Sequence, residues 1–85
     1  MTIKGLFLIE INSLYYDIEL NVIIFSSGKK IFFLNTLTNE SLGSYDFEVV
    51  SNMEYNKHLA TLFLGTVKGE IIAFPWPNKP SNIMG

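Results

Sequence analysis

Short apolar runs alternate with polar turn residues along the whole chain, and this pattern predicts an all-β protein. The runs are rich in β-branched and aromatic residues and recur about every ten positions, which is typical of strands. Residues 14–20 also fit a short helix loosely, but that run lacks a capping residue and a strand is favoured. The eight predicted strands are Thr2–Glu10, Ile11–Asp17, Leu20–Ser26, Lys30–Asn35, Ser41–Asp46, Val49–Tyr55, Leu59–Thr66 and Glu70–Phe74.

Two glycine-containing segments predict tight turns between the most apolar strands. Ser27-Gly28-Lys29 separates one pair, and Val67-Lys68-Gly69 separates another. We expect Gly69 to adopt a positive φ, because glycine enters that region without steric cost. Pro75 has no N–H group for a strand ladder, so it should end the last strand.

The chain repeats itself with a period of about forty residues. A shift of 39 aligns Leu14 with Met53 and Leu20 with Leu59, and a shift of 40 after the glycine turn aligns Ile31 with Ile71. Each unit contains four predicted strands, which is the signature of a β-propeller blade. The sequence therefore predicts two four-stranded antiparallel blades at about 1–38 and 39–78, followed by a tail or linker at 79–85.

Composition excludes several classes of protein. Hydrophobic residues make up 48% of the 85 residues and charged residues 16%, which is too apolar for a disordered chain. The net charge is −2, with lysine as the only basic side chain besides one histidine, and this argues against nucleic-acid binding. The longest apolar runs have four residues, so we expect no membrane insertion. The N-terminus lacks a signal-peptide pattern, so we expect an intracellular protein.

No residue pattern predicts catalysis, a cofactor or a metal site. The chain has no cysteine, and His58 lies in a polar turn without a second histidine. The carboxylates are scattered, with nothing to mark any of them as buried or paired. The serines lack the elbow motif of a nucleophile, and Gly65–Gly69 lacks the full phosphate-loop spacing. We therefore expect a protein that is not an enzyme.

Four aromatic residues near strand ends are the candidate protein-binding residues: Tyr15, Tyr16, Phe74 and Trp76. The segment from Phe74 to Pro80 contains three prolines and the only tryptophan, so it is stiff. Tryptophan contributes a large contact area at low entropic cost, which suits a protein–protein contact. The alternative, slightly favoured, is that Trp76 packs back onto its own blade.

The segment Gly28–Tyr45 resembles a WD-repeat blade, with a glycine turn, an apolar strand, a polar loop and an outer strand in the expected places. The string Leu62–Pro77, L-F-L-G-T-V-K-G-E-I-I-A-F-P-W-P, resembles a late blade of the cilia- and flagella-associated WD-repeat proteins of the axoneme. The Trp-Asp pair is absent, with Leu34-Asn35 and Phe74-Pro75 in its places, and so is the usual Gly-His pair. The resemblance implies a scaffold that binds axonemal proteins in the cilium or flagellum, with a structural or dynein-regulatory role.

Such propellers close with six to eight blades, whereas this chain accounts for two. Open blade edges carry unpaired backbone groups. We therefore expect a part of a longer propeller, or edges that a partner chain covers. The alternative is a small self-contained β-domain that oligomerises or binds a ligand through its sheet edges.

Overall fold

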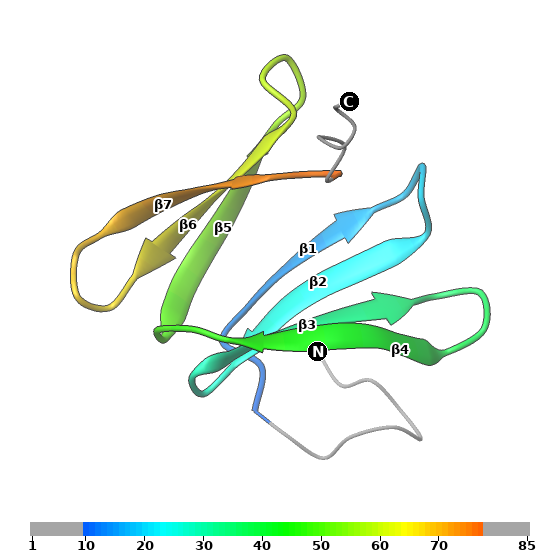
Figure 1. Ribbon diagram of the computed structural model, residues 1–85, viewed down its shortest axis with the longest axis horizontal. Coiled ribbons are helices and arrows are strands. Elements are labelled where there is room, and N and C mark those ends of the chain that lie inside the picture. Colours follow the sequence, from blue (N-terminus) through cyan, green and yellow to red (C-terminus); the bar gives the residue numbers. More distant parts are fainter. Residues whose placement is uncertain (1–9, 78–85) are drawn as a thin grey trace.

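The protein forms two antiparallel β-sheets in a computed structural model that describes residues 10–77 (Figure 1). The first sheet has the order β1-β2-β3-β4 and the second β5-β6-β7. This confirms the predicted all-β class. The predicted strand Thr2–Glu10, except for its last residue, and the tail at 79–85 lie outside the described residues. The strands are β1 (Ser13–Asp17), β2 (Val22–Ser27), β3 (Lys30–Asn35), β4 (Glu40–Asp46), β5 (Val50–Asn56), β6 (Thr61–Thr66) and β7 (Ile71–Pro75).

Seven of the predicted strands recur in the structure, and both glycine turns are in place. Gly28 has φ +56° and Gly69 has φ +84°, in the region that glycine tolerates best. The helix alternative for residues 14–20 is wrong, because Asp17 ends β1 and a turn follows directly. The Asp17 side chain accepts hydrogen bonds from the next turn's backbone, which favours a turn over a helix.

The strand Glu40–Asp46 requires a correction to the predicted grouping. The sequence repeat placed it at the start of the second unit, but it pairs with β3 and completes the first sheet. A four-residue turn at 36–39 joins β3 to β4, and so short a connection favours an antiparallel neighbour. The first sheet therefore has four strands and the second has three among the described residues.

The two sheets share the same hydrogen-bonding register. Tyr16 lies opposite Ile23 in the first sheet, and Tyr55 lies opposite Leu62 in the second, 39 positions later. The next strand pair repeats as well, since Ile23↔Leu34 corresponds to Leu62↔Phe74. The shift of 39 for the first two strands and 40 for the third is the shift that the sequence predicts. The second sheet therefore repeats the first, strand by strand, through β7.

Even the turns of the two sheets correspond. Asn21 has φ +58°, and its counterpart Ala60 has φ +49°. The Asn21 carbonyl accepts a hydrogen bond from Thr36 N at 2.9 Å, and the Ala60 carbonyl accepts one from Trp76 N at 3.0 Å. Each bond fastens the first turn of its sheet to the end of the third strand.

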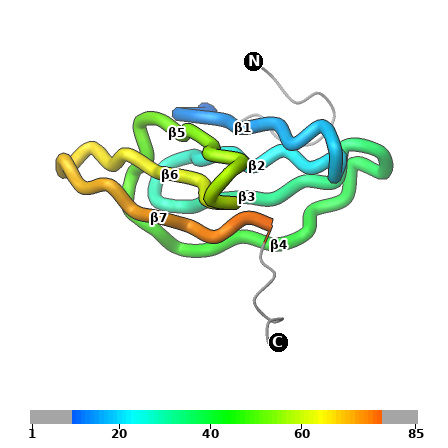
Figure 2. The backbone as a smooth tube through the Cα atoms, turned by 90° about the horizontal axis from the view of Figure 1, so that it is seen from above, coloured from blue at the N-terminus to red at the C-terminus, as the bar shows by residue number. Residues whose placement is uncertain are grey.

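The core lies between the sheets. Figures 1 and 2 show β1 beside β5. Side chains also bridge the sheets farther along, where the Phe74 ring of β7 lies 5.9 Å from the Phe33 ring of β3. One face of each sheet packs into this core, and partly buried aromatic side chains surround it. The buried residues of this cluster are Val22, Ile24, Ile31 and Phe33 from the first sheet, Leu62 and Leu64 from the second, and Val50 at the start of β5. Phe25 and Leu34 of the first sheet are also buried but lie outside the cluster.

Candidate functional site

Three turns and the end of β7 converge at one end of the molecule. The turns at 18–21 and 36–39 lie together, because every second connection of an antiparallel meander falls at the same end. The turn at 57–60 joins them, since Lys57 Nζ lies 3.3 Å from Glu19 Oε2. Trp76 follows β7 and is hydrogen-bonded to Ala60. This end therefore gathers segments from both sheets.

Asp17 connects the two sheets at this end. Its side chain is only 8% exposed. Oδ1 accepts hydrogen bonds from the backbone N–H groups of Glu19 and Leu20, both at 3.0 Å. Oδ2 accepts a hydrogen bond from Trp76 Nε1 at 2.7 Å. The carboxylate therefore fixes both its own turn and the segment that follows β7.

The predicted binding residues Trp76 and Phe74 lie between the sheets, half-buried. The Trp76 ring is 5.6 Å from the Phe33 ring, and the Phe74 ring is 5.9 Å from it. Phe33 belongs to the first sheet, so the Trp76 ring packs against the neighbouring sheet, whereas the favoured alternative expected it to pack on its own blade. Both rings border a hollow of about 290 Å³ beside β4, so part of each remains accessible.

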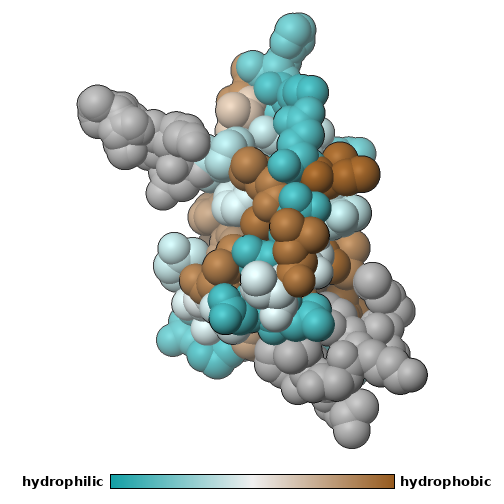
Figure 3. Space-filling view, turned by 90° about the vertical axis from the view of Figure 1, so that its right-hand side faces the viewer, coloured by the Kyte–Doolittle hydropathy of each residue, from teal (hydrophilic) through white to brown (hydrophobic). Residues whose placement is uncertain are grey.

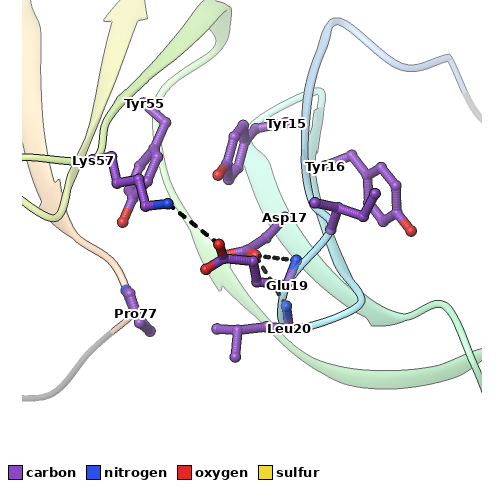
Figure 4. Close-up of a pocket in the computed structure, with 9 residues that line it drawn as sticks. Tyr15, Tyr16, Asp17, Glu19, Leu20, Tyr55, Lys57 and Pro77 are labelled. Atoms are coloured by element: carbon purple, nitrogen blue, oxygen red, sulfur yellow. Dashed lines mark hydrogen bonds and ion pairs between the residues drawn. The ribbon is translucent and has the colours of Figure 1, made fainter.

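Tyr15 and Tyr16 point to different sides of β1. The Tyr15 ring faces the Tyr55 ring of the second sheet, with centroids 5.1 Å apart. Tyr16 is 45% exposed and turns away from the pair (Figure 4). Of the four predicted residues, the structure therefore packs Tyr15, Phe74 and Trp76 against the core between the sheets, whereas Tyr16 borders a pocket there with its ring turned away.

A pocket of about 270 Å³ opens between the sheets below the Tyr15–Tyr55 pair (Figure 4). The turn residues 18–20, Lys57 and Pro77 surround its mouth. Burial raises the pKa of the Tyr15 phenol above its usual 10.0, and the nearby Asp17 carboxylate raises it further. The Tyr55 hydroxyl donates a hydrogen bond to the Trp76 carbonyl at 2.8 Å.

Exposed apolar side chains lie on the three turns at this end, and two of them, Ile18 and Leu20, line the pocket. Figure 3 looks at this end of the molecule and shows apolar surface across its middle. Ile18 is 71% exposed and Leu37 is 74% exposed, so neither contributes much to the core. Together with two other exposed aliphatic residues of these turns, they form what we call the turn surface: Ile18, Leu20, Leu37 and Leu59.

The residues considered for catalysis are exposed or make ordinary hydrogen bonds and ion pairs. His58 is exposed in the turn at 57–60, and no group of three metal-binding side chains occurs within residues 10–77. Ser26 is fully buried and donates to the Val50 carbonyl. Lys30 pairs with Asp46, and its hydrogen bond lowers the pKa of that carboxyl. None of these groups faces another in a way that would activate a nucleophile.

Asp17 is the site residue that the sequence analysis missed. The sequence shows it as one of several scattered carboxylates, whereas the structure buries it and gives it three hydrogen-bond donors. A signal was present, since the repeat aligns Asp17 with Asn56. Both residues end the first strand of their sheet, and both accept a hydrogen bond from the backbone of the turn that follows. For Asn56, Oδ1 accepts this bond from Leu59 N at 2.9 Å.

Comparison of the sequence with protein-family models and with curated proteins found no match. Across the described residues, the structure has no helix of the length and apolarity needed to cross a membrane.

Proposed function

We propose that this protein is a non-catalytic scaffold for protein–protein interaction, built from two propeller-type blades of the WD-repeat kind. The observation that carries the proposal is the repeated register of the two sheets. Tyr16↔Ile23 and Tyr55↔Leu62 are equivalent pairs, and the agreement continues through the third strand of each sheet. A repeat of whole sheets that stack side by side is the way in which propellers are built.

The stacking of the two sheets supports further stacking beyond the second one. The second sheet covers the face of the first that carries Ile24, Ile31 and Phe33. The register makes Phe63, Ile71 and Ala73 the corresponding residues of the second sheet. Asn52, Glu54 and Gly65 lie on the same face as these three residues, and we call this face the open face.

Equivalent positions on the two faces differ sharply in exposure. Ile31 is 4% exposed, whereas Ile71, the same residue type at the corresponding place, is 77% exposed. Exposed large aliphatic side chains on a sheet face mark a surface that another element covers. The remaining blades of a parent propeller, or a partner chain with a similar sheet, are the occupants that the proposal assigns to the open face.

The turn surface supports the interaction role. Propeller-like scaffolds bind other proteins through the loops at the ends of their strands, and here three turns expose aliphatic side chains at one end of the molecule, where Ile18 and Leu20 line a pocket. The resemblance of Leu62–Pro77 to axonemal WD-repeat proteins extends the proposal to a ciliary or flagellar scaffold.

Self-association of the purified chain tests the stacking proposal. We expect the protein to associate as its concentration rises, measured by light scattering, because the open face then meets another apolar sheet face. Ile71→Glu should reduce that association while circular dichroism stays unchanged. Leu37→Glu is the matched control, since Leu37 is 74% exposed but lies on the turn surface.

Two results would contradict the proposal. A folded protein that stays monomeric at every concentration has no face that needs covering, and a self-contained β-domain would then explain the chain better. Equal effects of Ile71→Glu and Leu37→Glu would show that association depends on general hydrophobicity and not on the open face.

A further inference from the structure

The pocket between the sheets carries an excess of negative charge. Two carboxylates, Asp17 and Glu19, and one ammonium group, Lys57, line it. Three hydrogen-bond donors fix the Asp17 carboxylate, so its position is preorganised. The Glu19–Lys57 pair is exposed, with side chains 71% and 79% accessible, and exposed pairs of this kind are weak. A cation that enters the pocket can therefore replace Lys57 beside Glu19.

The aromatic walls suit a planar cation. The Tyr15 and Tyr55 rings lie 5.1 Å apart at an interplanar angle of 31°, above Glu19 in Figure 4. The rings face one another, and Figure 4 shows their hydroxyl groups directed toward the pocket. The Tyr15 hydroxyl makes no hydrogen bond to any of the described residues, so its oxygen is available as an acceptor. A guanidinium group has five N–H donors in one plane, and it can meet a carboxylate and a phenol oxygen together.

The rim of the pocket is apolar. Ile18, Leu20 and Pro77 contribute side chains around its mouth, and Leu59 is exposed on the neighbouring turn. An extended segment that places a cation in the pocket would therefore bring its neighbouring side chains against aliphatic groups.

We infer that this pocket binds an arginine side chain of a partner protein, presented by an extended segment with apolar residues on both sides of the arginine. The inference rests on the proposed scaffold function and names the chemistry of the partner that this end of the molecule recognises. Glu19 and the Tyr15 oxygen accept hydrogen bonds from the guanidinium, the hydroxyl ends of the two tyrosines border it, and Asp17 holds the turn that carries Glu19.

A peptide titration of the full chain tests the inference. The probe is acetyl-Leu-Arg-Leu-amide, and the matched control probe replaces arginine by citrulline, which has the same shape without the charge. Backbone amide shifts measured by nuclear magnetic resonance should locate arginine-peptide binding at Tyr15, Glu19 and Tyr55. The citrulline peptide should bind at least fivefold more weakly.

Two variants should change the affinity in opposite directions. Glu19→Gln removes an acceptor charge and should weaken binding about two- to fivefold. Lys57→Gln removes the competing cation and should strengthen binding by a similar factor. Glu70→Gln, an exposed residue at the opposite end of the molecule, is the control and should leave the affinity unchanged.

Three results would overturn the inference: no peptide-induced shift at the pocket, equal binding of the arginine and citrulline peptides, or weaker binding by Lys57→Gln. The self-association of the open face is measured on a different surface. Loss of peptide binding with normal self-association would reject the arginine site alone, whereas loss of both would also reject the proposed scaffold.

Discussion

The hydrogen bond from Trp76 Nε1 to Asp17 Oδ2 should be a main contributor to the packing of the two sheets. It is 2.7 Å long, joins residues 59 positions apart in the sequence, and is partly buried. A hydrogen bond to a charged group contributes about 1.5–3 kcal/mol to stability. A chain of this size has a total unfolding free energy of about 4–13 kcal/mol at the usual value per residue. This one contact is therefore a substantial share of the stability.

A double-mutant cycle with Asp17→Asn and Trp76→Phe isolates this contact. Asparagine keeps one oxygen for the N–H groups of Glu19 and Leu20, but its amide nitrogen cannot accept from the indole. Phenylalanine removes the indole donor, and its loss of ring area is the same in both backgrounds and cancels. We expect each single variant to lower the unfolding free energy, with a coupling energy of about 1.5 kcal/mol between them.

Urea unfolding followed by circular dichroism measures the four proteins of the cycle. Additive effects, within about 0.5 kcal/mol, would refute the reasoning, because independent residues behave in that way. A changed denaturant slope in one variant would instead indicate that its unfolded or folded state differs in compactness.

Three further predictions concern the turns, the Tyr15 phenol and the core. Gly69→Val should cost about 1–3 kcal/mol of stability, because valine is strained at φ +84°, whereas Lys68→Val should change it by less than about 0.5 kcal/mol; comparable losses in urea unfolding would contradict the turn geometry. The raised pKa of Tyr15 means that the folded state retains the phenol proton to a higher pH than the unfolded state does. The resulting contribution to the unfolding free energy is complete below pH 10.0 and should be lost as the pH rises through the folded pKa. Tyr15→Phe should flatten that decline in urea midpoints measured across this range, and an unchanged slope would contradict it. Leu62→Ala should cost about 2–5 kcal/mol because the side chain is fully buried, while Ile18→Ala at 71% exposure should stay within about 0.5 kcal/mol in the same assay.

The strands and the repeat could be predicted from the sequence because they depend on local pattern. β2 and β3 are runs of β-branched and aromatic residues on either side of a glycine turn, and the shift between units follows from aligned apolar positions. The same alignment gives the strand register, since Ile23 and Leu62 occupy equivalent places. Periodicity of apolar residues therefore carries most of the information about this fold.

The grouping of β4 and the role of Asp17 could not be predicted in the same way. A repeat can be divided at any point along the chain, so the alignment alone does not say which sheet Glu40–Asp46 joins. The partner of Asp17 is Trp76, which is distant in sequence and belongs to the other sheet. Contacts of this kind depend on how the sheets pack, and no local pattern specifies them.

Solvent exposure of Ile31 and Ile71 tests the central claim most directly, because these residues are identical in type and equivalent in register. Methyl resonances can be measured in the dilute protein with a soluble paramagnetic agent. We predict strong broadening of the Ile71 methyl signals and little broadening at Ile31, as exposures of 77% and 4% require. Equal broadening at both positions would contradict the claim that the second sheet covers the first and leaves its own equivalent face open.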